Sequence, residues 1–187
     1  YFFNNGELKD NVNILSSEFG IFYGNNDLSI FYSGVILVGE NYTLESDSMT
    51  YNTILREATT FGYTEIISED STHIKSLGGT FRQESNNSNL KSSKIESSNY
   101  ILEADYINFD EENSVYYAKN NVILNIKETN YFVYGDEGIY DKSKNLTKIF
   151  GNSLLKKNIE NDTFYLSSDT ILAIDNSQDI NQLFAYN

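Results

Sequence analysis

The chain of 187 residues contains 15 Tyr and 12 Phe but no Cys, Pro or Trp. The absence of Cys excludes disulfides and cysteine-ligated metal sites. Thirteen basic and 27 acidic side chains give a net charge of −14, which disfavours binding to nucleic acid and docking on an anionic membrane. No run of 18 apolar residues is present, so the sequence predicts no membrane-spanning helix.

An internal repeat organises the chain. Each copy begins with an aliphatic anchor, followed two positions later by a small residue and three positions later by an acid. The anchors, spaced 28 to 33 residues apart, are Leu15, Leu44, Ile74, Leu102, Val133 and Leu166. The acids are Glu18, Asp47, Asp105, Asp136 and Asp169. The third copy has Leu77 in place of the acid, and the last has Ala173 in place of the aromatic residue that follows four positions later.

Every copy predicts two strands separated by turns. First-half strands end in Asn, Asp, Gly and Ser clusters that turn a chain, as at 42–52, 100–110 and 131–141. Second-half strands carry a Gly or Asn about 15 residues after the acid and then an aliphatic run, at 31–38, 60–67, 117–124 and 149–155. Because the apolar period is two rather than 3.6, no helix is expected. Residues 82–99 are rich in Ser and Asn and predict a long, exposed loop with a weak strand.

The apolar alternation changes phase inside a strand. Leu102 and Ala104 share one parity and Ile107 and Phe109 share the other, although all four are apolar. Both pairs face the interior only if a bulge or sharp bend at Asp105–Tyr106 inserts one residue. The repeated acid is therefore predicted to mark a structural corner, where it bonds nearby backbone amides.

Stacked repeats suggest the architecture. One strand pair cannot bury its apolar face, but stacked pairs can, with backbone hydrogen bonds running from copy to copy. We expect an all-β fold of antiparallel strands, with two facing sheets around an elongated apolar interior. Residues 1–187 form a single domain in this interpretation. Because no aliphatic strand follows the lead-in at 182–187, the chain is expected to be a fragment of a longer array.

The predicted interior is the candidate binding site. Its inward residues are Leu15, Phe22, Val35, Leu37, Leu44, Met49, Tyr51, Leu102, Ile107, Phe109, Val122, Leu124, Val133, Tyr140 and Leu166. Two interpretations stay open: a packed core, or a groove that remains partly open and holds acyl chains. Each methylene buried in such a groove would contribute about 0.8 kcal/mol.

The sequence offers little chemistry for catalysis. Acids that recur with the structural period are typical of corners, while a cation-binding ladder and a catalytic acid pair are the alternatives. His73 is the single His, so it provides neither a His metal cluster nor a proton relay. No nucleophile elbow, phosphate loop, zinc signature or EF-hand loop occurs. We expect no enzyme activity, no metal and no cofactor.

The repeats resemble the OstA-like family, the periplasmic lipopolysaccharide-transport proteins of Gram-negative bacteria (LptA and LptC types). The matching segments are LESDSMTYN, LEADYINFD, VYGDEGIYD and LSSDTILAID, with GVIL, NNVIL and GNSLL as strand partners. The stretch from Asp162 to Asn187 is most similar to the OstA-like proteins of Bacteroidetes.

The resemblance implies a β-jellyroll (β-taco) that carries lipopolysaccharide across the periplasm towards the outer membrane. It implies lipid A acyl chains in the groove and no catalysis. Protomers, or other lipopolysaccharide-transport proteins, would join by edge-strand pairing, and an export signal would lie upstream of this chain. The alternative is a structural β-solenoid, such as an adhesin or scaffold segment, with a sealed core and no lipid cargo. A polysaccharide-active enzyme on a β-solenoid is a third reading.

Overall fold

The computed structural model describes residues 2–9, 13–24, 27–82, 87–110, 113–127, 131–141, 143–144, 146–159, 162–174 and 182–187. Within these ranges the chain forms strands and turns and no α-helix, so it has no helix that could cross a membrane. Several residues of the predicted turns, including 25–26, 111–112 and 175–181, lie outside the described residues.

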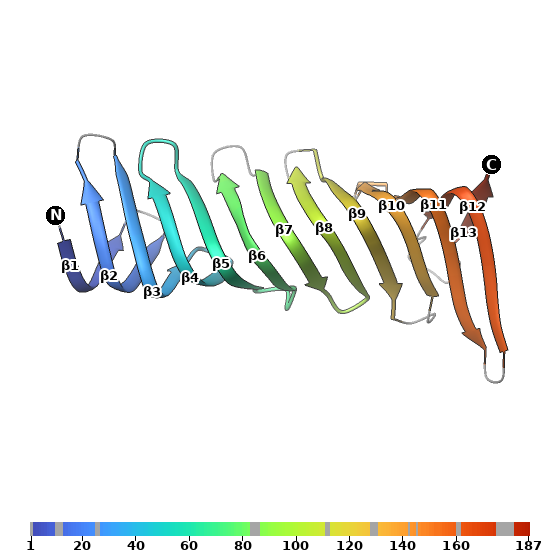
Figure 1. The fold of residues 1–187 in the computed structure, drawn as a ribbon, viewed down its shortest axis with the longest axis horizontal. Helices are drawn as coiled ribbons and strands as arrows, with labels where there is room; N and C mark the ends of the chain where they lie inside the picture. The colour runs from blue at the N-terminus through green and yellow to red at the C-terminus, as the bar shows by residue number, and fades with distance from the viewer. Residues whose placement is uncertain are drawn as a thin grey trace. The chain divides into compact units, whose positions relative to one another are not determined.

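The described residues contain thirteen strands in one antiparallel sheet, and each strand is hydrogen-bonded to the next in chain order (Figure 1). The strands are β1 (Phe2–Lys9), β2 (Ile14–Tyr23), β3 (Leu28–Val38), β4 (Tyr42–Asn52), β5 (Glu57–Ser68), β6 (His73–Arg82), β7 (Asn87–Glu96), β8 (Tyr100–Asp110), β9 (Val115–Ile126), β10 (Tyr131–Asp141), β11 (Leu146–Ile159), β12 (Asp162–Ile174) and β13 (Gln182–Tyr186). The predicted all-β, antiparallel fold of stacked strand pairs is confirmed.

The chain divides into two compact units, residues 1–91 and 92–187, with the division inside β7. We call them the N-terminal unit and the C-terminal unit. Each has its own set of buried apolar side chains.

The long, exposed loop predicted for residues 82–99 is wrong, and the weak strand predicted within it is the full strand β7 at residues 87–96. Leu90 and Ile95 are both buried although their spacing is odd. Ser92 lies between them with a φ of 45°, and a left-handed residue inside a strand shifts the side-chain alternation. This phase change hides the period-two pattern in a stretch otherwise rich in Ser and Asn.

Register shifts occur where the repeat places its acids. The pairing of β8 with β9 shifts between Glu103 and Tyr106, the interval in which the apolar alternation predicts a change of phase. Equivalent shifts lie between Ser16 and Phe19 in β2 and between Ser46 and Ser48 in β4. The partner strands carry left-handed residues at these points, among them Asn120 at φ 60°. Asn tolerates this conformation better than most residues, because its side chain can bond locally.

The C-terminal unit folds over at these bends. Tyr100 is the first residue of β8, and Phe109 lies near the other end of that strand. Tyr140 on β10 is level with Phe109, because both are paired with Tyr116 on β9. In a flat sheet, nine residues of extended strand would separate these levels by about 30 Å. The ring centroids of Tyr100 and Tyr140 are nevertheless 6.4 Å apart. The two halves of the bent strands therefore face each other across an interior.

Three rows of cross-strand neighbours line the interior of the C-terminal unit. The leucine row is Leu102, Leu124, Val133, Leu155 and Leu166. The central row is Ile107, Ala118, Gly138, Ile149 and Ile171. The aromatic row is Phe109, Tyr116, Tyr140, Thr147 and Ala173.

The N-terminal unit has three corresponding rows. Its leucine row is Leu15, Leu37, Leu44, Ile66 and Ile74. Its central row is Gly20, Phe31, Met49, Thr60 and Gly79. Its aromatic row is Phe22, Ser29, Tyr51, Ala58 and Phe81.

Candidate functional site

An apolar cavity of about 160 Å³ lies in the C-terminal unit. It is lined by Ile95, Asn99, Tyr100, Leu102, Phe109, Tyr116, Ala118, Leu124, Ile126, Gly138, Ile139, Tyr140, Thr147, Ile149 and Ala173. These residues come from β7 to β12 and from the turn before β8. Apart from the three tyrosines, the polar side chains in the lining are those of Asn99 and Thr147. No charged side chain lines the cavity. Such a lining suits a hydrocarbon ligand.

Aromatic rings form one wall of this cavity. The rings of Tyr116 and Tyr140 stack with centroids 5.8 Å apart, and Phe109 meets Tyr116 edge-on at 4.9 Å. Tyr100 approaches Tyr140 from the other half of the folded strands. Aromatic pairs of this kind contribute about 0.5–1.5 kcal/mol beyond the area they bury. The contact of Tyr100 with Tyr140 thus joins the two halves beside the cavity.

Four of the residues predicted to face a groove line this cavity: Leu102, Phe109, Leu124 and Tyr140. Two of them belong to the leucine row and two to the aromatic row. Of the other residues predicted in this unit, Ile107, Val122 and Val133 are buried and Leu166 is half-buried, and these four are not among the lining residues.

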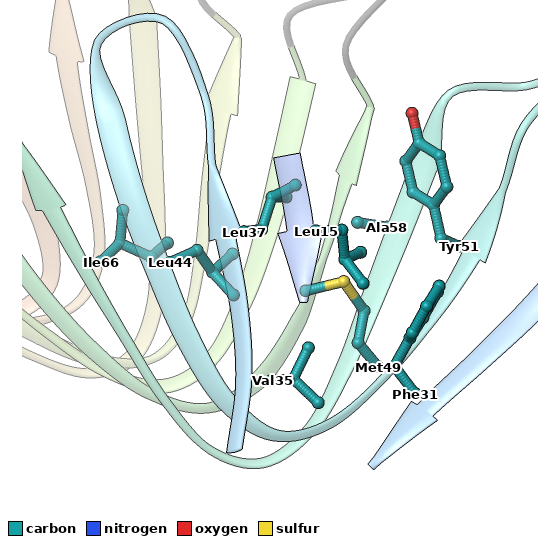
Figure 2. Packing of buried hydrophobic residues seen from close by; sticks show 9 residues of the cluster. All are labelled: Leu15, Phe31, Val35, Leu37, Leu44, Met49, Tyr51, Ala58 and Ile66. Carbon is teal, nitrogen blue, oxygen red and sulfur yellow. The ribbon is translucent and has the colours of Figure 1, made fainter. Parts of the chain in front are cut away.

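The residues predicted in the N-terminal unit lie in a tightly packed cluster. Its buried members are Leu15, Phe31, Val35, Leu37, Leu44, Met49, Tyr51, Ala58 and Ile66, each at most 6% exposed. Figure 2 shows their side chains gathered on the inner side of the curved strands. Phe22, the remaining predicted residue of this unit, is half-buried. Here the side chains themselves fill the interior.

Sequence reasoning did not single out several lining residues. Tyr116 and Ala118 precede the Asn120 turn on β9, and Gly138 follows Asp136 by two positions on β10. Counting two residues from each turn would have placed them on the inner face. Ile95 was not among the predicted inward residues because its segment was interpreted as a long, exposed loop with a weak strand.

Four of the five repeated acids, Glu18, Asp47, Asp105 and Asp136, contact the turn on the next strand. Asn121 and Asn152 donate side-chain hydrogen bonds to Asp105 and Asp136, with Nδ2–Oδ2 distances of 2.9 and 2.8 Å. The Ser33 hydroxyl donates to Glu18 with an Oγ–Oε2 distance of 2.6 Å. These contacts fit the corner role that we propose for the acids.

The two other acids make different contacts. The backbone amide of Tyr63 donates to Asp47 at 2.9 Å, next to Gly62, whose φ is 78°. In the last repeat, the backbone amide of Asp169 donates to the Asn187 side chain at 3.3 Å.

Among the described residues, no group of three or more His, Asp and Glu side chains is placed so that it could hold a metal ion. His73 Nε2 lies 2.5 Å from Glu65 Oε1, and Lys75 is 3.4 Å from the same oxygen. This ion-pair group is a cross-strand contact between β5 and β6.

Comparison with known proteins gives two likenesses. Residues 1–47 match the family described as OstA-like protein. The chain is also similar to the crystal structure of LptH, described as the LptA-homologous periplasmic component of the conserved lipopolysaccharide transport device from Pseudomonas aeruginosa. That likeness has 6% identity and a TM-score of 0.34, and it covers 82% of this chain and 93% of LptH. No curated protein sequence matches the chain. The OstA-like match thus lies in the N-terminal unit and covers 47 of 187 residues.

Proposed function

We propose that the chain is a non-enzymatic, periplasmic lipopolysaccharide-transport protein of the OstA-like family, related most to the Bacteroidetes members. We propose further that residues 1–187 are one OstA-like domain. The observation that carries the proposal is the apolar cavity between the folded halves of the C-terminal unit. The family match over residues 1–47 supports the same reading.

The chemistry of the cavity favours an acyl chain as its occupant. A cavity of about 150 Å³ lined by aliphatic and aromatic side chains stays dry and takes up benzene, and the present cavity of about 160 Å³ has such a lining. Each methylene that enters would contribute about 0.8 kcal/mol. The cargo would therefore be held by burial of hydrocarbon.

The overall charge argues that the headgroup is not the main attachment point. At a net charge of −14, the protein repels the phosphates of lipid A at long range. We propose that the headgroup stays outside, where divalent cations can neutralise it, and that acyl-chain contact provides the affinity.

Edge strands offer a way to join partners. β1 and β13 are at the two ends of the strand order and each pairs with one neighbour in the described sheet. Unpaired backbone amides and carbonyls of an edge strand can extend a sheet into another chain. We propose that a second copy or another lipopolysaccharide-transport protein pairs there, which sedimentation at rising protein concentration would test.

A sealed scaffold is the competing reading, and the N-terminal unit favours it. Phe31, Leu44 and Met49 are fully buried there, and their cluster needs no ligand to complete it. On this reading the cavity of the C-terminal unit would be a packing defect without cargo.

Photo-crosslinking separates the two readings. A benzophenone amino acid is placed at Phe109 or Tyr140, which line the cavity, and the protein is irradiated with radiolabelled lipopolysaccharide. The matched control is Tyr117, the outward neighbour of Tyr116 on β9, which is 40% exposed. Transport predicts adducts from the two cavity positions and none from Tyr117. Absence of adducts from both cavity positions would support the sealed scaffold.

A further inference from the structure

The cavity adjoins the two small residues in the central row of the C-terminal unit. Ala118 and Gly138 are cross-strand neighbours in the middle of that row, and both line the cavity. An ideal Cβ at Gly138 would lie 2.9 Å from Ile149 Cδ1 and 3.4 Å from Val122 Cγ1. The side chain of Ile149 therefore already lies against Gly138, and Ile149 and Gly138 together line the cavity beside Ala118.

The N-terminal unit fills the corresponding space with its own side chains. Phe31 and Met49 are cross-strand neighbours in the middle of its central row. Both are 0% exposed, and Figure 2 shows them next to each other within the cluster.

Two independent landmarks make these positions equivalent. Phe31 and Ala118 each lie two residues before a left-handed turn, which begins at Ser33 (φ 65°) and at Asn120 (φ 60°). Met49 and Gly138 each lie two residues after a repeated acid, Asp47 or Asp136. Sequence spacing and strand register therefore give the same correspondence.

We infer that Ala118 and Gly138 are the specificity-determining residues of the cargo site, and that they admit the end of a single hydrocarbon chain. The inference rests on the proposed function for the nature of the cargo. The chain end occupies the volume that Phe31 and Met49 occupy in the N-terminal unit.

The size of the cavity sets this limit of one chain. A volume of about 160 Å³ corresponds to about one benzene-sized group, or about six carbons of one chain. Several acyl chains of one lipid cannot enter together. The remaining carbons and the other chains must lie outside this cavity.

The test introduces larger side chains at Ala118 and Gly138. In Ala118→Phe the added phenyl ring matches the benzene-sized space, so it excludes the ligand while filling the interior as Phe31 does. Gly138→Ala is a milder second variant, whose new methyl group requires Ile149 Cδ1 to move. Leu172→Phe is the matched control, since it adds the same ring on β12 next to Ala173 but with the opposite side-chain direction.

Two probes are used on the full chain: benzene, and n-octyl glucoside below its micelle-forming concentration, both followed by NMR titration. Each buried methylene accounts for about a fourfold change in affinity. Exclusion of about six carbons thus predicts a loss on the order of a thousandfold for Ala118→Phe. Gly138→Ala should give a smaller loss, and Leu172→Phe should bind as the wild type does.

The outcomes distinguish this inference from the proposed function. If Ala118→Phe and Gly138→Ala bind both probes as the wild type does, the inference is wrong. Lipopolysaccharide adducts at Phe109 would then still support transport. If the wild type binds benzene, Ala118→Phe does not, and no lipopolysaccharide adduct forms, the cavity assignment stands and the proposed cargo is wrong. A wild type that binds neither probe overturns the inference outright.

Discussion

Phe31 provides a quantitative test of the packed interior in the N-terminal unit. Its side chain is 0% exposed and lies among Leu15, Leu44 and Met49. Truncation to Ala removes the ring and leaves a cavity that the neighbours fill only in part, which typically costs about 3–5 kcal/mol for a buried Phe. Phe61 on β5 is 51% exposed, so Phe61→Ala should change the free energy of unfolding by no more than about 0.5 kcal/mol.

Urea unfolding followed by circular dichroism measures both variants. With a slope of about 2–3 kcal/mol per molar urea, Phe31→Ala should lower the midpoint by roughly 1–2 M, and Phe61→Ala should leave it nearly unchanged. A Phe31→Ala cost below about 1 kcal/mol, or no greater than that of Phe61→Ala, would contradict a filled interior in this unit. The contrast between the packed interior of the N-terminal unit and the cavity of the C-terminal unit would then be wrong.

Two further predictions concern a corner and a turn. Gly151 has a φ of 75°, and a Cβ there would lie 2.8 Å from Asp136 Cβ, so Gly151→Ala should cost at least about 1–2 kcal/mol in thermal unfolding; an unchanged melting temperature would contradict the corner geometry. Hydrogen bonds from Lys144 and Ser143 hold the pKa of Asp141 at about 2. Since this folded-state pKa is depressed, the stability from Asp141 should be present above pH ~4 and lost as pH falls from there through about 2. NMR titration of the Asp141 carboxyl in the wild type and in Lys144→Met measures this. A titration near pH 4 in both proteins would contradict the hydrogen-bonded turn.

The repeat made much of the architecture predictable. The odd spacing between Ala104 and Ile107, both apolar, required a change of phase, and the register of β8 shifts between Glu103 and Tyr106. The six predicted anchors all lie in the leucine rows of the two units, whereas Ile66 and Leu155 of these rows were not predicted. The strand β7 was predicted only as a weak strand within a loop, because its two apolar residues, Leu90 and Ile95, lie on opposite sides of a left-handed Ser92.

The cavity could not be predicted from inward residues alone. Its walls include predicted positions such as Leu102 and Phe109, but also the small residues Ala118 and Gly138. The alternation pattern identifies large apolar residues and passes over small ones. The strand register shows that these two small residues are neighbours, and the spacing from the turns and acids then matches them to Phe31 and Met49 in the other unit.

Photo-crosslinking to lipopolysaccharide from Phe109 and from Tyr117 is the most direct measurement of the central claim, that hydrocarbon cargo enters the C-terminal unit. Phe109 lines the cavity, and Tyr117 is 40% exposed on the outward face of β9. Cargo in the cavity predicts a labelled adduct at Phe109 and none at Tyr117. Equal labelling at both positions, or no labelling at Phe109, would contradict the claim.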